Sequence, residues 1–260
     1  MIPLRVLGIG VIGPGLNGWE ASIPLLKNGA VGYRPGETVI PVFTLLPANE
    51  RRRVTPTIKL ALAAAEQAVD AAAIESGKLA TVFASSLGDM QISDNICRAL
   101  ATDDKPVSPT QFHNSVHNAP AGYWSIGTGS RSASTSLAVA NASFPAALLE
   151  AALQSQASGY PVMLIGYDYP APPPLSSYAP LEVAFAVSMV VQANEDIPQL
   201  ALTLGDGKPT TLSNPELERI RLGNPAARAL PLLQAIADRE ASRIFLPYID
   251  RQMIVELVAA

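Results

Sequence analysis

The chain has 260 residues and a formal net charge of −4 at pH 7, with 48% hydrophobic and 15% charged residues. This length allows one large α/β domain or two small ones, and the low charged fraction indicates a thick core, a large buried interface, or both. The acidic balance, with no basic runs between aromatic residues, excludes nucleic acid as a partner, and the single cysteine excludes an internal disulfide. We expect neither a membrane-spanning segment nor a signal peptide, so the chain is predicted to be cytoplasmic.

The first third of the chain predicts a strand and two helices. Residues 2–12 are apolar and indicate a buried strand, and the following "GPGLNG" turns into a helix near residues 19–27. Asn28 and Gly29 are the residue types that end a helix in a left-handed conformation. After a loop, Thr55 and the proline that follows it predict the start of an Ala-rich helix.

The remaining elements alternate between strands and helices. In chain order we expect a buried strand in "LATVFASSLG", a short helix around Cys97, helical pieces in "SPTQFHNSVHNAPAGYWSIGTGS", a strand over residues 133–140, a helix over residues 142–156, strands in "YPVMLIGYDYP", "LEVAFAVSMVVQAN" and "QLALTLGDG", a helix in "NPAARALPLLQAIADRE" and a strand in "RIFLPY". This alternation predicts a layered α/β fold with a mixed sheet and no linker between independent domains.

Gly8, Gly10 and Gly13 form a G-x-G-x-x-G pattern directly after the first strand, as in dinucleotide-binding folds. Pro14 and the glycines after it delay the helix that would face a pyrophosphate, and Glu37 lies in a loop instead of ending a second strand. We therefore interpret the glycines as positions where the first strand packs tightly and turns, and we expect no cofactor.

The only two histidines, His113 and His117, are four residues apart and could share one helix face. No Glu or third ligand is spaced to complete a metal site with them, so we expect no bound metal.

The stretch "SLAVANASFPAALLEAA", residues 136–152, reads as an apolar strand that turns into a helix. In several enzyme folds such a turn presents a nucleophile. Here the turn carries Asn141, whose amide nitrogen is delocalised and cannot attack a carbonyl. Ser143 is one or two residues into the helix, where capping or packing is the expected role.

Several segments resemble the N-terminal half of a β-ketoacyl synthase, an enzyme of the thiolase fold. They are "VLGIGVIGPGLNGWEASIPLLKNG", "FASSLGD", "FHNSVHNAPAGYWSIGTGSRS" and "NASFPAALLEAA", and together they cover about residues 2–170. The resemblance implies a thiolase-like α/β/α/β/α fold with a mixed sheet. It divides the chain into a ketosynthase-like domain, residues 1–195, and a shortened C-terminal region, residues 196–260, that packs on it and leaves an apolar face unpartnered.

The sequence departs from that family where its chemistry is performed. Asn141 stands at the position of the nucleophilic cysteine, no histidine follows residue 170, and the "Arg-Pro-Phe-Asp" loop is replaced by "PAPPPLSSYAP". The resemblance therefore implies a catalytically inactive chain-length factor. Such a subunit pairs with an active full-length β-ketoacyl synthase, as a heterodimer or heterotetramer, and meets an acyl carrier protein transiently. The half-length form is similar to small ketosynthase-like proteins of bacterial aryl polyene pathways.

The same resemblance assigns roles to particular residues. The nucleophile strand of the family pairs across the dimer axis, which places Ser134, Ser136, Ala138 and Ala140 at the interface. The segment before that strand lines the acyl pocket in the family. The candidates for the tunnel wall are therefore Phe112, His113, Val116 and Tyr123. Asn141 is expected to cap the helix that follows it.

Other readings stay open at this point. Phe112 and Val116 could be ordinary core residues. The chain could also be an independent thiolase-fold enzyme, such as a decarboxylase or an acyltransferase that works without the cysteine, or a scaffold that docks carrier proteins without touching the acyl chain.

Overall fold

The structure is a computed structural model that describes residues 1–194 and 196–258. Its strands are β1 (Ile2–Gly13), β2 (Leu16–Asn17), β3 (Ala80–Ala84), β4 (Ser134–Leu137), β5 (Val162–Asp168), β6 (Phe185–Ala193), β7 (Leu200–Gly205), β8 (Ser242–Tyr248) and β9 (Arg251–Leu257). Its α-helices are α1 (Trp19–Ala30), α2 (Ala48–Arg51), α3 (Pro56–Ala72), α4 (Met90–Leu100), α5 (Pro109–Asn114), α6 (Ala119–Thr128), α7 (Ser143–Ser158), α8 (Pro215–Gly223) and α9 (Leu230–Asp238).

The strands of the described residues form one sheet in the order β4-β3-β5-β6-β1-β7-β9-β8, with β2 as a short hairpin partner of β1. The neighbours β4, β3 and β5 run parallel, and every other pair is antiparallel. The mixed sheet predicted from the sequence is therefore confirmed.

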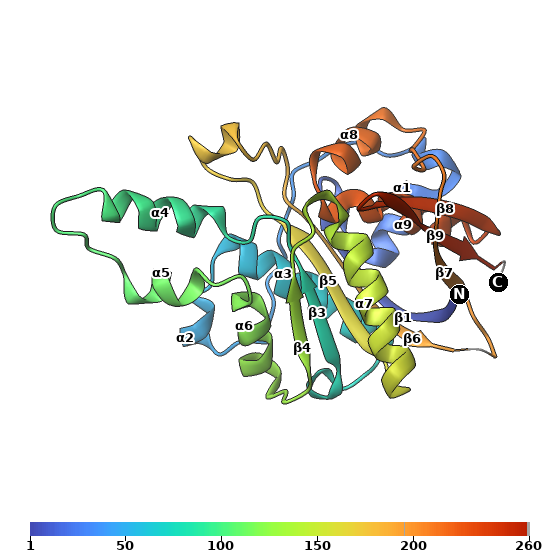
Figure 1. Ribbon diagram of the computed structural model, residues 1–260, viewed down its shortest axis with the longest axis horizontal. Coiled ribbons are helices and arrows are strands. Elements are labelled where there is room, and N and C mark those ends of the chain that lie inside the picture. The colour runs from blue at the N-terminus through green and yellow to red at the C-terminus, as the bar shows by residue number, and fades with distance from the viewer. Residues whose placement is uncertain (195, 259–260) are drawn as a thin grey trace.

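The helices cover both faces of the sheet (Figure 1). Helix α3 contacts β1, β5 and β6 from one side, and α7 contacts β3, β5 and β6 from the other. Helix α7 also contacts β8, and α9 contacts both β8 and β9, so these helices pack between the first strands and the C-terminal ones. One apolar cluster joins α7, α9 and the C-terminal strands, and a second one surrounds α3.

The glycines of the first strand serve close packing. A Cβ atom at Gly8 would lie 2.2 Å from the carbonyl oxygen of Ala68, and one at Gly10 would lie 2.1 Å from that of Ala64. Both carbonyls belong to α3, so only glycine lets the helix backbone approach β1 this closely. The structural interpretation of the G-x-G-x-x-G pattern is confirmed for these two positions.

The predicted helix ends of the first third are also confirmed. The side chain of Thr55 accepts a hydrogen bond of 3.2 Å from the N–H of Ile58, as an N-cap does. At the other end of α1, Asn28 and Gly29 have φ angles of 54° and 71°, so the helical conformation stops before them.

A protruding arm extends from the body of the molecule (Figure 1). It consists of α4, the loop over residues 101–108 and α5, and it leads through α6 to β4. Asp89 caps α4 by accepting a hydrogen bond from the N–H of Ile92. The arm is tied to other parts of the chain by hydrogen bonds from Asn114 to the carbonyl of Arg53 at 2.9 Å and from Arg98 to that of Pro173 at 3.0 Å. Its outer part carries exposed apolar side chains of Leu100 and Phe112.

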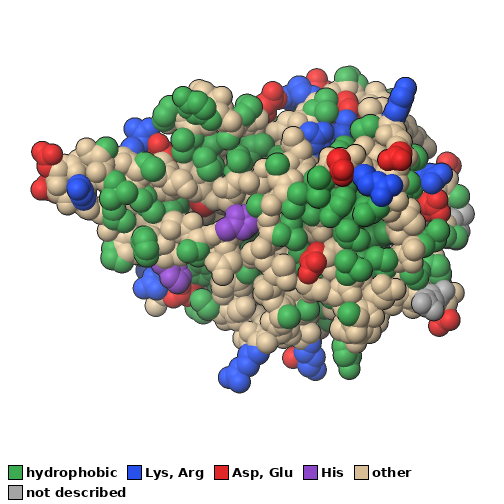
Figure 2. All heavy atoms as spheres, viewed as in Figure 1, with side chains coloured by type: hydrophobic (Ala, Val, Ile, Leu, Met, Phe, Trp, Pro, Cys, Tyr) green, Lys and Arg blue, Asp and Glu red, His purple; other side chains and the backbone are tan. Residues whose placement is uncertain are grey.

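The C-terminal region contains two elements that the sequence analysis did not identify, α8 and β9. Its outer sheet face is polar in part, with an ion pair of 3.3 Å between Arg243 and Glu256 and the Arg243 guanidinium over the ring of Phe245. Figure 2 shows apolar side chains gathered on one face of the body of the molecule, and Leu204, Leu222 and Ile249 of the C-terminal region are exposed. The unpartnered apolar face expected after residue 195 stays a prediction. The division at residues 195 and 196 stays a prediction, since the apolar cluster around α7 takes side chains from both sides of it.

None of the helices in the described ranges is both long and apolar enough to cross a membrane.

Candidate functional site

The carboxyl ends of β3, β4 and β5 meet at one end of the sheet, because these three strands are parallel. The chain leaves β4 through the turn of residues 138–139 and a short 3₁₀ helix, Ala140–Ala142, before α7 begins. Ala140 has a φ of 43°, a left-handed conformation that costs a residue with a Cβ about 1–2 kcal/mol. Asn141 follows it and is exposed.

The turn is closed by Ser143. Its hydroxyl accepts a hydrogen bond of 3.0 Å from the N–H of Val139 and donates one of 2.8 Å to the carbonyl oxygen of Ala140. The side chain is buried, so the hydroxyl holds the turn together and is not free to attack a substrate. The role predicted for Ser143 is confirmed.

The side chain of Asn141 makes no hydrogen bond within the described residues, and α7 begins without a side-chain cap. The predicted capping role of Asn141 is therefore wrong. The physical reason is that Ser143 already satisfies the backbone groups of the turn, while Asn141 faces solvent.

The two histidines do not form a common site. Nε2 of His117 lies 3.0 Å from the carbonyl oxygen of Ser85, which requires the ring to donate from that nitrogen. His113 is exposed on the arm and meets the ring of Tyr123 edge-on at 6.2 Å. Among the residues that the structure describes, no group of three or more His, Cys, Asp or Glu side chains could hold a metal ion.

The four candidates for the tunnel wall fall into two groups. Tyr123 is buried, and its hydroxyl donates a hydrogen bond of 2.9 Å to Oδ1 of Asn114; its burial raises the pKa of the phenol. Phe112, His113 and Val116 are exposed, with 69% of Phe112 and 53% of Val116 accessible. The alternative that Phe112 and Val116 are core residues is wrong for this chain.

Strand β4 is an open edge of the sheet. Its ladder with β3 uses the backbone groups of Ala133, Thr135 and Leu137, so the N–H and carbonyl groups of Ser134 and Ser136 point to the free side. Of the four residues predicted at an interface, Ser134, Ala138 and Ala140 are exposed and Ser136 is partly buried. Ser134 and Ser136 belong to the edge strand, whereas Ala138 and Ala140 follow it along the chain, and a place at an interface stays a prediction for all four.

A buried acid at this end of the sheet was missed by the sequence analysis. Asp168, the last residue of β5, is fully buried, and its Oδ1 accepts hydrogen bonds of 2.8 Å from Ser85 Oγ and from the N–H of Ser86. Burial raises the pKa of its carboxyl group to about 7, although these hydrogen bonds act in the opposite direction. The signal in the sequence was an acid that ends the apolar run "VMLIGYD".

The acid fastens the ends of two parallel strands together. Asn224 donates to the backbone carbonyl of Asp168 at 3.2 Å and to that of Val183 at 2.9 Å, so a C-terminal segment joins the same network. The neighbouring Tyr167 has a buried hydroxyl without a partner in the described residues, and burial raises the pKa of this phenol. This arrangement ties the ends of β3 and β5 and a C-terminal segment together.

The family of the chain follows from its sequence and fold together. The sequence model of the family "Beta-ketoacyl synthase, N-terminal domain" matches residues 28–245, which is more than half of the chain. The protein belongs to this family, and its mixed sheet has the thiolase-like ketosynthase fold. A search among curated proteins found no match.

Three solved structures share this fold over essentially whole chains. A chain of the ketosynthase ApeO in complex with its chain length factor ApeC, from Xenorhabdus doucetiae, matches with a TM-score of 0.74 and 20% identity, over 98% of this chain and 100% of that chain. A second match is a chain of AntDE:AntF, a type II polyketide synthase acyl carrier protein in complex with its ketosynthase bound to the hexaketide. Its TM-score is 0.74 and its sequence identity 14%, over 100% of both chains. The ishigamide ketosynthase/chain length factor matches with a TM-score of 0.67 and 13% sequence identity over 99% of both chains.

Proposed function

We propose that this protein is a catalytically inactive chain-length factor that pairs with an active β-ketoacyl synthase and helps to shape its acyl tunnel in type II polyketide or fatty-acid-like biosynthesis, of which an aryl polyene pathway is one example. The observation that carries the proposal is an open, uncharged sheet edge directly beside an elbow that has no nucleophile. An amide at position 141 cannot form an acyl thioester, and the hydroxyl of Ser143 is engaged in the turn.

The two edges of the sheet differ in a way that supports pairing through β4. At the β8 edge, the N–H of Thr210 donates to the carbonyl of Phe245 at 2.9 Å, and Thr210 Oγ1 accepts from the N–H of Phe245 at 2.9 Å. Pro247 has no N–H to offer, so this edge is closed to another strand. Strand β4, "STSL", has no charge and no proline, and no backbone hydrogen bond from the described part of the chain closes its outer side.

The protruding arm supports the same face as the partner surface. Phe112 and Val116 expose most of their apolar area on the arm and the segment that leads to α6, and α6 contacts β4. Ile126 on α6 and Leu153 on α7 are also exposed. Removing such a side chain from water contributes about 1.5–3 kcal/mol when it is fully covered. A partner that covers this surface would place these side chains beside its own acyl chain.

The structural neighbours are compatible with such partners. ApeO with ApeC and the ishigamide pair are complexes of a ketosynthase with a chain length factor, and AntDE:AntF includes an acyl carrier protein. By analogy we propose an active ketosynthase as the stable partner and a carrier protein as the transient one.

The edge is tested with a proline at position 136. The N–H of Ser136 points away from β3, so Ser136→Pro removes a donor for the partner strand while the ladder within the chain is kept. We expect the variant to lose the one-to-one complex with the ketosynthase encoded beside it, measured by co-purification and light scattering. The matched control is Arg243→Pro, which removes an outward N–H at the other sheet edge and should leave the complex intact. A complex that survives Ser136→Pro would contradict pairing through β4.

The tunnel role is tested by product length. Val116→Ala and Phe112→Ala shorten side chains on the proposed tunnel wall and leave more space for the acyl chain. We expect longer acyl products from the reconstituted complex with these variants, and shorter ones with Val116→Trp. Unchanged products from a complex that still forms would favour the docking scaffold over the chain-length factor.

The alternative of an independent enzyme requires turnover by the chain alone. Incubation of the purified chain with malonyl and acyl thioesters should give no product under the proposal. Turnover that disappears in Asn141→Ala would overturn the proposed inactivity.

A further inference from the structure

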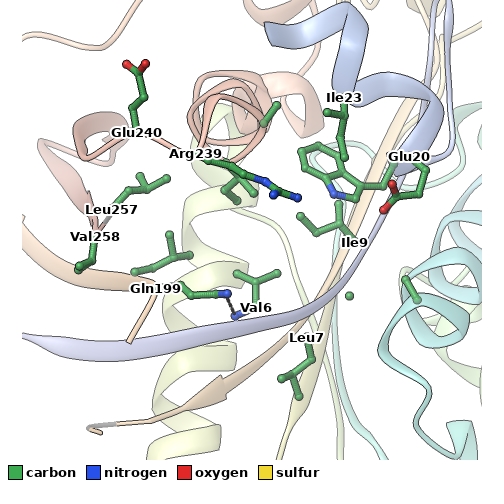
Figure 3. A pocket seen from close by; sticks show the side chains of 16 residues that line it. Val6, Leu7, Ile9, Glu20, Ile23, Gln199, Arg239, Glu240, Leu257 and Val258 are labelled. Atoms are coloured by element: carbon green, nitrogen blue, oxygen red, sulfur yellow. Dashed lines mark hydrogen bonds between the residues drawn. The ribbon is translucent and has the colours of Figure 1, made fainter. Parts of the chain in front are cut away.

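A pocket of about 340 Å³ lies far from β4, at the place where β7 leaves the edge of β1 (Figure 3). Strand β7 pairs with β1 only at Ile2, Pro3 and Leu4. Beyond Leu4, none of the described strands pairs with this edge of β1 until β2 begins. The pocket covers this gap and is bounded by α1, the end of α9, the start of β7 and the end of β9.

At the end of the gap next to Leu4, Gln199 takes the place of a neighbouring strand. The N–H of Gln199 donates to the carbonyl of Leu4 at 2.8 Å, and Oε1 of Gln199 accepts from the N–H of Val6 at 2.9 Å. Figure 3 shows this second bond at the rim of the pocket. Gln199 thus adds one hydrogen bond to β1 at Val6, beyond the last residue of β1 that pairs with β7.

The upper end of the gap is satisfied in a similar way. The N–H of Val11 donates to Oε1 of Gln67 on α3 at 3.0 Å, and its carbonyl accepts from the N–H of Gly18 at 2.8 Å. Val11 therefore turns its backbone groups away from β6, and the alternation of an antiparallel ladder gives Ile9 the same direction.

Ile9 is left between these two ends. Within the described residues, no hydrogen bond reaches its N–H or its carbonyl on the free side of β1. The residue is only 4% exposed, and buried backbone groups are satisfied in nearly all folded proteins. The floor of the pocket therefore offers one donor and one acceptor to a bound molecule.

The walls are apolar and the mouth is charged. Apolar side chains from five elements line the pocket: Val6, Ile9, Trp19, Ile23, Leu200, Ile236 and Leu257. In Figure 3 the guanidinium of Arg239 reaches across the pocket between Ile9 and Ile23 toward the side where Glu20 lies, whereas the carboxylate of Glu240 points away. Within the described residues, no carboxylate lies within ion-pair distance of Arg239, and Glu20 lines the pocket from α1.

From this we infer a binding site for a small amphipathic acid in which an apolar chain, an amide and a carboxylate follow one another, as in an N-acyl amino acid. The apolar chain occupies the walls, the amide pairs with the N–H and carbonyl of Ile9, and the carboxylate meets Arg239. Such a volume is at the lower end of the range for small-molecule sites. The site is independent of the proposed pairing through β4, because β4 is an edge strand and the pocket lies between β1 and β7 in the interior of the sheet.

The test is isothermal titration of the purified chain, together with its ketosynthase partner if the two co-purify, using N-octanoylglycine as the probe. We expect saturable one-to-one binding that becomes about tenfold or more weaker in Arg239→Gln, because a charge-assisted hydrogen bond is lost. Arg131→Gln, at an exposed arginine far from the pocket, is the matched control and should bind like the parent. Glu20→Gln should bind more tightly, since a like charge at the mouth is removed.

Two further ligands separate the contributions. The methyl ester of N-octanoylglycine lacks the carboxylate, and N-octanoylsarcosine lacks the amide N–H that would donate to Ile9; both should bind more weakly than the acid. Ile23→Phe fills the pocket and should abolish binding while the thermal midpoint of unfolding is kept. No heat of binding at millimolar probe, or equal affinities for all three ligands and for Arg239→Gln, would overturn the inference.

Discussion

Replacing the buried acid Asp168 by asparagine should change how stability depends on pH. Asp168 holds the ends of β3 and β5 through hydrogen bonds from Ser85 and Ser86, and burial raises its pKa to about 7. Asparagine offers an oxygen for the same donors but carries no charge at any pH. The substitution therefore removes the titration and keeps the main contacts.

The sign follows from the two protonation states. Between about pH 4 and pH 7 the folded chain retains the proton on Asp168, whereas the unfolded chain has lost it, so the folded state binds more protons and the free energy of unfolding falls as pH rises. The pKa lies about three units above its ordinary value of 3.8, and each unit corresponds to about 1.4 kcal/mol. Up to about 4 kcal/mol of stability should be lost as pH rises through this window. The contribution is fully present below about pH 4, and no more is lost above about pH 7.

Urea denaturation of the parent and of Asp168→Asn at several pH values from 4.5 to 8.5 measures this effect. We expect the difference in unfolding free energy to shift steadily in favour of the variant as pH rises, and then to level off above about pH 7.5. The control is Ser188→Ala, which removes a buried hydroxyl that donates to the carbonyl of Leu164. This hydroxyl does not titrate, so the difference between the parent and the control should not change with pH. A difference between parent and Asp168→Asn that stays constant with pH would refute the raised pKa.

Three further changes test the packing and the caps. Gly10→Ala should lower the free energy of unfolding by about 3 kcal/mol, because the new Cβ would lie 2.1 Å from the carbonyl oxygen of Ala64; urea titration measures this loss. Thr55→Ala should cost about 1 kcal/mol through loss of the α3 cap, visible as a lower midpoint of thermal unfolding. Tyr123→Phe should cost about 1 kcal/mol, because Oδ1 of the buried Asn114 loses its donor, and faster hydrogen exchange at the base of the arm should accompany it.

Elements whose signals are local could be predicted from the sequence. The strand in residues 2–12, the cap at Thr55 and the end of α1 at Asn28 each depend on a few neighbouring residues, and all three are found. The G-x-G-x-x-G pattern was interpreted correctly because its helix starts too late to face a phosphate, and the structure adds the reason that α3 packs against Gly8 and Gly10.

Features that depend on distant partners could not be predicted. Strand β9 was not identified, although it lies in the sheet between β7 and β8. Its sequence "RQMIVEL" has only three consecutive apolar residues between polar ones and shows no regular alternation. Asp168 was missed for a similar reason: its burial follows from contacts with Ser85 and Asn224, which are 83 and 56 residues away. The pocket at Ile9 arises from the departure of β7, which no local pattern encodes.

The elbow at Asn141 poses the question why the chain keeps a strained turn around an amide side chain that cannot act as a nucleophile. The left-handed Ala140 and the two hydrogen bonds of Ser143 maintain the turn, although the side chain of Asn141 contributes no hydrogen bond to it. Under the proposed inactivity, catalysis does not explain the strain of this turn. The turn sets the direction in which α7 leaves β4, and α7 in turn bonds β4 through Gln154 and Thr135 at 3.0 Å. Under the proposed pairing, the strained turn persists because it presents the open β4 edge at a fixed angle to the partner.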